Sequence, residues 1–211
     1  MKTSLTYATV ALAAAVAGFL IYRVAATPPT STASEPAPIE ASKGVPEQLP
    51  EFTLADRSGD PRSILSWPGK SLIVNFWATW CAPCRREIPL LKQIQDDHQD
   101  AGFQVVGVAV DFRDDVLAYA DEIGIDYPLL IGEEDGLDAV NAFGISAVGF
   151  PFTAFTDQNG RIVTVHLGEL VAPQADVILE TVQRVNDGEL SIAEARTRVA
   201  TALAALEQES G

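Results

Sequence analysis

Cys81 and Cys84 are the only two thiols in this 211-residue chain, and two residues separate them. Such a pair can form a structural disulfide, bind a metal ion or exchange electrons with other thiols. A disulfide across so short a loop gains little loop-closure entropy, and small domains that depend on disulfides carry several. A structural zinc site needs four ligands, and only His98 and His166 are available beside the sulfurs. The pattern favours a reacting pair, with copper(I) binding as the weaker alternative.

The segments on either side of the cysteines explain why the pair would react. Residues 71–78, SLIVNFWA, form a nearly continuous apolar run that predicts a strand buried on both faces. Residues 84–98 have apolar positions at helical spacing. The cysteines therefore lie where a helix begins, and the partial positive charge of a helix N-terminus stabilises a thiolate. We expect Cys81 to attack and Cys84, one turn into the helix, to resolve the mixed disulfide.

The order of the remaining elements predicts an α/β fold. Alternating strands and helices, closed by an antiparallel hairpin, are typical of a mixed sheet flanked by helices. The final hairpin is expected to turn at Asn159-Gly160, a favoured tight-turn pair. The expected elements are, in chain order, a hairpin, a strand, a helix, a strand, a helix, a strand, a helix, a second hairpin and two helices: 51–64, 71–78, 84–98, 103–111, 114–124, 127–132, 133–144, 152–168, 173–185 and 191–207.

The first 26 residues differ in composition from the rest of the chain. An uncharged run from Thr3 to Tyr22 follows Lys2, and as a helix it would span about 30 Å, the thickness of a bilayer core. The small residues at 24–26 resemble a signal-peptide cleavage site, but Arg23 directly before them favours an uncleaved anchor. Positive charge on the short side places the protein body outside the cytoplasm. We therefore predict a single-pass helix in the inner (cytoplasmic) membrane, with the catalytic domain on the periplasmic side.

Composition divides the chain into four predicted parts. An N-terminal anchor, 1–26, is followed by a Pro-rich flexible tether, 27–49, which is too poor in apolar residues to fold. A thioredoxin-sized domain, 50–188, and a C-terminal helical extension, 189–211, complete the chain. The hydrophobic content of 47% is sufficient for a packed core, and the formal net charge of −15 argues against nucleic acid as a partner.

The segment LIVNFWATWCAPCRREIP, residues 72–89, resembles the active-site region of the membrane-anchored TlpA/ResA-like thioredoxins. The resemblance extends from about Leu49 to about Val185 and includes VGFPFTAFTDQNGRIV at 148–163. It implies a thioredoxin-like fold with an N-terminal β-hairpin, a mixed central sheet and a central insert, 112–144. It also implies a thiol–disulfide oxidoreductase.

The resemblance implies roles for individual residues. Pro151 matches the cis-proline that packs against the disulfide in this fold, and Trp80 lies at the lip of the site and covers the disulfide. Glu87 matches a glutamate of the ResA-like branch that could relay the proton of Cys84. The alternative for Glu87 is a surface glutamate paired with a basic neighbour. Asn75 departs from thioredoxin proper, which has a buried aspartate at that position.

Three aromatic residues near the motif leave two interpretations open. Phe150 stands where the family usually has a smaller residue, and Phe152 follows Pro151 on its other side. Both are either core aromatics or an apolar wall of the groove that receives a partner. For Trp77 we expect core packing.

The resemblance also implies partners. Family members form mixed disulfides with client proteins, usually reducing cysteine pairs in cytochrome c maturation or copper-site assembly, and a membrane electron-donor protein must then recharge them. We expect no cofactor. Two other functions stay open, a non-redox copper(I)-binding module and a peroxiredoxin-like peroxidase. Peroxiredoxins carry a threonine a few residues before a lone cysteine, whereas Thr79 precedes Cys81 by only two positions.

Overall fold

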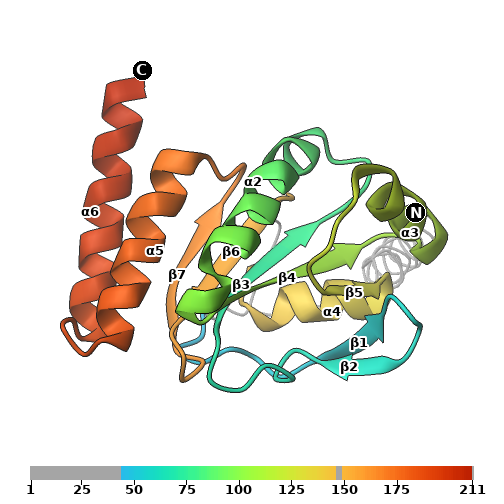
Figure 1. Ribbon diagram of the computed structural model, residues 1–211, viewed down its shortest axis with the longest axis horizontal. Helices are drawn as coiled ribbons and strands as arrows, with labels where there is room; N and C mark the ends of the chain where they lie inside the picture. The colour runs from blue at the N-terminus through green and yellow to red at the C-terminus, as the bar shows by residue number, and fades with distance from the viewer. Residues whose placement is uncertain (1–43, 146–148, 211) are drawn as a thin grey trace, which may run out of the picture. The chain divides into compact units, whose positions relative to one another are not determined.

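The fold is built on a seven-stranded mixed sheet (Figure 1). The computed structural model describes residues 44–145 and 149–210, so the predicted anchor and the tether up to residue 43 lie outside the described part. Within that part, no helix has both the length and the apolar character needed to cross a bilayer. The strands are β1 (Thr53–Asp56), β2 (Pro61–Ser63), β3 (Ser71–Trp77), β4 (Phe103–Val110), β5 (Leu129–Gly132), β6 (Phe152–Thr156) and β7 (Ile162–Leu167).

The sheet has the strand order β2-β1-β5-β4-β3-β6-β7. Strands β3, β4 and β5 are parallel, while β6 pairs antiparallel with β3, and β1 pairs antiparallel with β5. Every residue of β3 is buried, because this central strand is covered on both faces as its apolar sequence predicted. The mixed sheet with flanking helices is confirmed.

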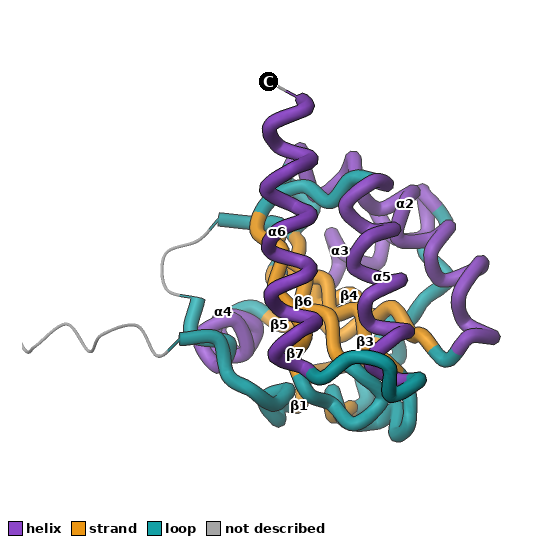
Figure 2. The backbone as a smooth tube through the Cα atoms, turned by 90° about the vertical axis from the view of Figure 1, so that its left-hand side faces the viewer, coloured by secondary structure: helices purple, strands orange, loops and turns teal. Residues whose placement is uncertain are grey.

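Helices cover both faces of the sheet (Figure 2). One apolar cluster packs α2, α3, α5 and α6 against the face that carries Ile73 and Trp77, and a second packs α4 against the face that carries Val74 and Phe76. Helix α6 lies along α5 in both views (Figures 1 and 2). The helices are α2 (Ala82–His98), the 3-10 turn η1 (Gln99–Ala101), α3 (Arg113–Ile123), α4 (Glu134–Ala142), α5 (Ala172–Asn186) and α6 (Ile192–Ser210).

Helix α2 continues through a proline and helix α3 ends at a glycine, within the ranges that the sequence predicted. Helix α2 runs on past Pro89, because the buried positions Leu91 and Ile94 keep their helical spacing beyond it. Helix α3 ends at Gly124, which adopts a left-handed conformation with φ 62° that a glycine takes without strain.

The β6–β7 hairpin is confirmed, but its turn is wider than the predicted two residues. The loop spans Asp157 to Arg161, and the Asp157 carboxylate holds it closed. Its Oδ1 accepts the N–H of Asn159 at 3.0 Å and the N–H of Arg161 at 2.8 Å, while Oδ2 accepts from the Arg161 side chain at 2.7 Å. Gly160 supplies the positive φ of 74° that the loop requires.

The same hairpin also binds the chain that enters the domain. The N–H of Leu49 donates to Gly160 O at 2.8 Å, and the N–H of Ile162 donates to Glu47 O at 2.9 Å. Leu49 is buried. The folded part of the chain therefore begins a few residues before position 50.

Candidate active site

The two cysteines form a disulfide at the start of α2. Cys81 is the N-cap residue with φ −85° and ψ 105°, and its Sγ accepts the N–H of Cys84 at 3.3 Å. The S–S distance is 1.99 Å and the Cα atoms are 5.3 Å apart, within the range for a disulfide. Cys81 is 4% exposed and Cys84 is 0% exposed. Cys81 is the slightly more exposed of the two, and its role as the attacking thiol stays a prediction.

Asp111, directly after β4, fixes the loop that leads into the cysteines. Its Oδ2 accepts the N–H of Thr79 at 2.9 Å and the Thr79 hydroxyl at 2.5 Å. These bonds connect the ends of the neighbouring strands β3 and β4 just before Cys81. They also occupy the hydroxyl that a peroxidase would direct at its cysteine.

Glu87 is a buried carboxyl on α2, one turn beyond Cys84, and the residue is only 1% exposed. Oε1 accepts from Asn75 Nδ2 at 2.7 Å, and Oε2 accepts the N–H of Leu170 at 2.7 Å. Burial raises the pKa of Glu87 to about 7, while these two hydrogen bonds act in the opposite direction. The alternative of an exposed glutamate paired with a basic neighbour is therefore wrong, because Glu87 packs inward and its partners are an amide and a backbone N–H.

Asn75 lets this carboxyl change its protonation state. Its Nδ2 also donates to Thr153 Oγ1 at 3.0 Å, whereas its Oδ1 is buried and has no partner among the described residues. In this orientation the amide donates to an ionised Glu87. If the amide group of Asn75 rotates so that Oδ1 and Nδ2 exchange places, Oδ1 can accept the O–H of a protonated Glu87. An aspartate at position 75 would offer no donor to the carboxylate.

The ionisable groups around Glu87 include Tyr127, His166 and Glu169. Burial raises the pKa of the Tyr127 phenol, and the charge of Glu87 adds to this effect, so Tyr127 remains protonated. Burial lowers the pKa of His166, whose Nε2 lies 3.3 Å from Glu169 O. Glu169 accepts a forked interaction from Arg86 on the surface. Among the described carboxyls, Glu87 is the one whose pKa burial raises to about 7.

The loop before β6 supplies the other wall of the site. The Phe150–Pro151 peptide bond is cis, as expected, and Pro151 O accepts the N–H of Gly168 at 2.9 Å. Trp80 is 69% exposed, and its ring centroid lies 6.0 Å from that of Phe150. Whether Trp80 and Pro151 act in exchange remains a prediction.

The structure separates the aromatic residues that the sequence left open. Phe152 is fully buried and stacks on Phe76 with ring centroids 4.3 Å apart, so it belongs to the core. Trp77 is also fully buried, as predicted. Phe150 is only half-buried and contacts Trp80 at the surface. One of the two phenylalanines therefore packs inside, and the other forms an apolar wall.

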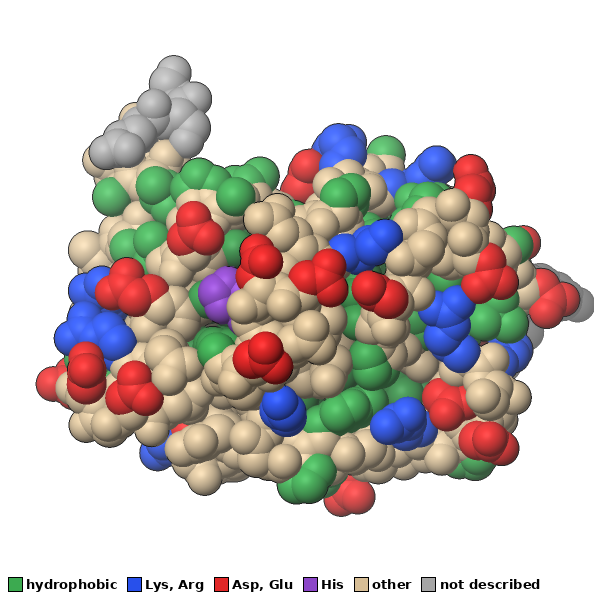
Figure 3. All heavy atoms as spheres, viewed as in Figure 1, with side chains coloured by type: hydrophobic (Ala, Val, Ile, Leu, Met, Phe, Trp, Pro, Cys, Tyr) green, Lys and Arg blue, Asp and Glu red, His purple; other side chains and the backbone are tan. Residues whose placement is uncertain are grey.

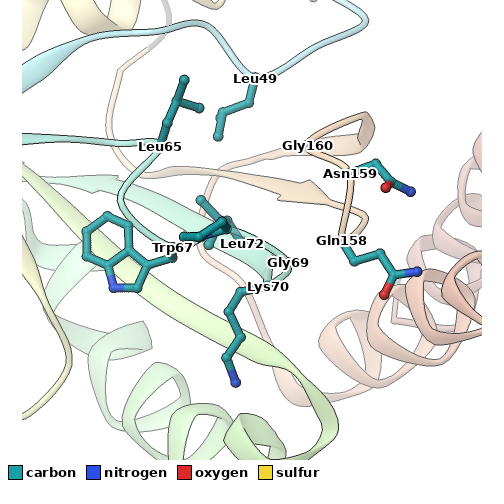
Figure 4. A pocket seen from close by; sticks show the side chains of 10 residues that line it. Leu49, Leu65, Trp67, Gly69, Lys70, Leu72, Gln158, Asn159 and Gly160 are labelled. Carbon is teal, nitrogen blue, oxygen red and sulfur yellow. The ribbon is translucent and has the colours of Figure 1, made fainter.

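A cavity of about 280 Å³ lies at the opposite end of β3 (Figure 4). Leu49, Leu65 and Trp67 form its apolar side, and the hairpin loop with Asn159 forms another (Figure 4). Lys70 is the one ionisable side chain among its described lining residues, which include no carboxylate, thiol or histidine. On the face drawn in Figure 3, acidic and basic side chains of the described residues are interspersed, without a continuous basic patch.

A C-x-x-C disulfide at the start of the helix that follows a buried parallel strand, on this sheet, defines a thioredoxin-like thiol–disulfide oxidoreductase. Residues 45–165 match the AhpC/TSA family, and the chain belongs to that family. It is an enzyme of the thiol–disulfide oxidoreductase class.

Individual relatives agree with this assignment. The thioredoxin-like protein YneN of Bacillus subtilis (strain 168) is 31% identical over 140 residues, which cover 64% of this chain and 78% of the relative. The thiol–disulfide oxidoreductase ResA of Geobacillus thermodenitrificans (strain NG80-2) is 29% identical over 135 residues, 64% of this chain and 75% of the relative. The crystal structure of a secreted thiol-disulfide isomerase from Corynebacterium glutamicum superimposes with a TM-score of 0.59 at 27% identity, covering 66% of this chain and 86% of that one.

Proposed function

We propose that this protein is a membrane-anchored oxidoreductase that works outside the cytoplasm and reduces cysteine pairs of client proteins. Such clients include proteins of cytochrome c maturation or of copper-site assembly. The observation that carries the proposal is the Cys81–Cys84 disulfide at the start of α2, with the buried carboxyl of Glu87 one turn further along that helix. The similarity to the ResA relatives and the long apolar N-terminal segment support the client class and the location.

The reaction begins with the reduced protein. The Cys81 thiolate attacks one sulfur of a client disulfide, the client S–S bond breaks, and the second client sulfur leaves as a thiolate that takes up a proton. Cys84 then loses its proton and attacks Cys81 Sγ, which breaks the mixed disulfide and releases the client sulfur that Cys81 had attacked, as a thiolate that takes up a proton. Two electrons pass to the client, and the protein ends as the Cys81–Cys84 disulfide.

Glu87 provides the acceptor for the proton of Cys84. Because Cys84 is fully buried, bulk water reaches its sulfur poorly, and an internal base is needed. A carboxyl whose pKa is raised by burial to about 7 is suited to both accept and return a proton near neutral pH. A membrane electron-donor protein then reduces the disulfide for the next cycle.

Trapping tests the attacking sulfur and the clients together. In Cys84→Ser, attack by Cys81 should still occur but resolution should fail, so client proteins accumulate as mixed disulfides that reductant releases. Cys81→Ser is the matched control and should trap none. Alkylation of the reduced wild-type protein should also modify Cys81 before Cys84. Equal trapping by both variants, or earlier labelling of Cys84, would contradict the assignment of Cys81.

Protein extracted from the membrane tests the predicted anchor. N-terminal sequencing should begin at or near Met1, and trapped clients should carry cysteine pairs exposed outside the cytoplasm. A soluble product that begins at Thr27 would show that the segment is cleaved.

A further inference from the structure

An apolar groove lies beside the disulfide on the side of the central insert. It has a volume of about 300 Å³, and Trp80 and Phe150 join it to the cysteine loop and the proline loop. Its other apolar residues are Val110 at the end of β4, Phe112 at the start of α3, and Leu137 on α4. Trp80, Phe112 and Leu137 are 69%, 62% and 50% exposed, which is costly for large apolar side chains unless a partner covers them.

The rim of this groove is acidic. Asp111, Glu133 and Glu134 are among its lining residues, and no described lining residue is basic. The side chains of Glu133 and Glu134 are exposed and form no hydrogen bond or ion pair with the described residues. Carboxylates at the start of α4 stabilise that helix by interacting with its dipole. This effect explains the two glutamates but not the exposed aromatic side chains beside them. Apolar anchors with unpaired negative charge at the edge fit a partner that brings an apolar side chain and a cation together.

We propose that this groove selects client segments in which a large apolar residue and one or two lysines or arginines flank the reactive cysteine. The inference rests on the proposed function, since it names which clients the disulfide serves. The groove is small, so it receives a single anchoring side chain from an extended segment. The basic residues of the segment reach Glu133 and Glu134 while its disulfide meets Cys81.

The test compares two synthetic peptides that contain the same C-x-x-C disulfide and the same flanking leucine. One peptide carries two lysines beside the leucine, and the other carries two glutamates. The second-order rate constant for oxidation of the reduced protein is measured with each peptide at low ionic strength and again in added salt. The basic peptide should react roughly three- to tenfold faster at low salt, and the ratio should approach one as salt screens the charges.

Charge variants of the rim then locate the preference. Glu133→Gln with Glu134→Gln should bring the ratio of the two rates close to one, and Glu133→Lys with Glu134→Lys should invert it. The matched control is Glu122→Lys with Asp138→Lys, which changes the net charge by the same amount at exposed sites on α3 and α4 outside the groove. The control should keep the preference for the basic peptide. Circular dichroism and thermal unfolding check that each variant is folded.

The apolar part of the groove has its own control. Leu137→Ala should lower the rate constant measured with the basic peptide. It should have a smaller effect on the rate constant of a basic peptide in which serine replaces the leucine. Leu65→Ala removes a leucine of similar exposure, 47% against 50%, from the far end of the sheet and should not distinguish these peptides.

The outcomes separate this inference from the proposed function. Equal rates for the basic and acidic peptides, or a preference that the groove variants and the control change alike, would overturn the client assignment while the oxidoreductase stands. Failure of the reduced, folded protein to exchange with either peptide would overturn both. A ratio that follows Glu133 and Glu134, and a leucine dependence that follows Leu137, would establish the groove as the client site.

Discussion

Two buried carboxylates lie at opposite ends of the molecule, and the protein treats them differently. Asp157, at the β6–β7 loop, is 0% exposed, and Glu87, one turn beyond Cys84, is 1% exposed. Asp157 pairs with the Arg161 guanidinium at 2.6 Å and accepts two backbone N–H groups. Glu87 accepts one backbone N–H and the Asn75 amide, and it has no ion pair with a described residue.

The difference separates a structural charge from one that can titrate. The Arg161 guanidinium and two backbone N–H groups compensate the charge of Asp157, and this carboxylate holds the loop closed. The charge of Glu87 is compensated only by dipoles, so burial favours its neutral form and places its titration near pH 7. A buried carboxylate is therefore a candidate for catalysis when its compensation is incomplete, and the same conservative substitution should affect the two residues in opposite directions.

The largest effect is expected from Asp157→Asn. The amide loses the charge-assisted bond to Arg161 and turns a donor toward the guanidinium. We expect the free energy of unfolding to fall by about 2 to 3 kcal/mol, since Arg161 is half exposed and regains water. Urea denaturation of the oxidised protein at pH 8 measures this loss. A change below about 1 kcal/mol would remove the contrast between the two carboxylates.

Glu87→Gln should instead stabilise the oxidised protein at pH 8, by about 1 to 3 kcal/mol. The pKa of Glu87 is about 7 in the folded state against an ordinary 4.5, so the folded protein binds the proton more tightly than the unfolded chain does. The contribution of Glu87 to wild-type stability is thus most favourable below pH 4.5 and declines as the pH rises to about 7, by about 3 kcal/mol in total.

Glutamine cannot ionise, so the variant should lack this decline. Urea denaturation of the oxidised wild type and variant at pH 4.5 and at pH 8 gives the difference. The two proteins should differ little at the lower pH and diverge at the higher one. Parallel stability curves across this range would mean that Glu87 ionises as readily as an exposed carboxyl.

Asn75→Asp should raise the pKa of Glu87 by about one unit, which is the smallest of the three effects. It replaces the amide donor 2.7 Å from Oε1 with a second carboxylate, and the two acids then titrate as a pair. The pH dependence of mixed-disulfide resolution should shift to higher pH by the same amount. Asn186→Asp, at the hairpin end, is the matched control and should leave this profile in place. Coincident profiles for wild type and Asn75→Asp would exclude Asn75 from the proton pathway.

Local patterns in the sequence were sufficient for the elements and for the position of the cysteines. The apolar run of β3, the helical spacing after Cys84 and the glycine that ends α3 each depend on neighbours a few residues away. The Asn159-Gly160 pair predicted only part of the turn, because the loop also depends on the Asp157 carboxylate. An aspartate two residues before an Asn-Gly pair commonly accepts the backbone N–H groups of the turn, so the signal was present.

The burial of Glu87 could not be read from local spacing. The spacing placed it on the same side of α2 as Cys84, but its depth depends on Leu170, which is 83 positions away in the sequence. The acidic groove is also non-local, because Phe112, Leu137 and Trp80 meet only when the insert folds against the end of β4. The separation of Phe150 from Phe152 likewise depends on contacts with Trp80 and Phe76, which the fold brings together.

The two outer strands of the sheet also bear on how the protein meets partly folded chains. Strand β2 has three residues and begins with Pro61, which has no N–H to donate. At the other edge α6 packs on β7, and the Arg196 side chain donates to Ile162 O at 2.8 Å and 3.2 Å. Both edges are therefore poor templates for an added strand. Under the proposed function the enzyme forms a mixed disulfide with each client, and edges of this kind keep a client strand from pairing with the sheet while the disulfide exists.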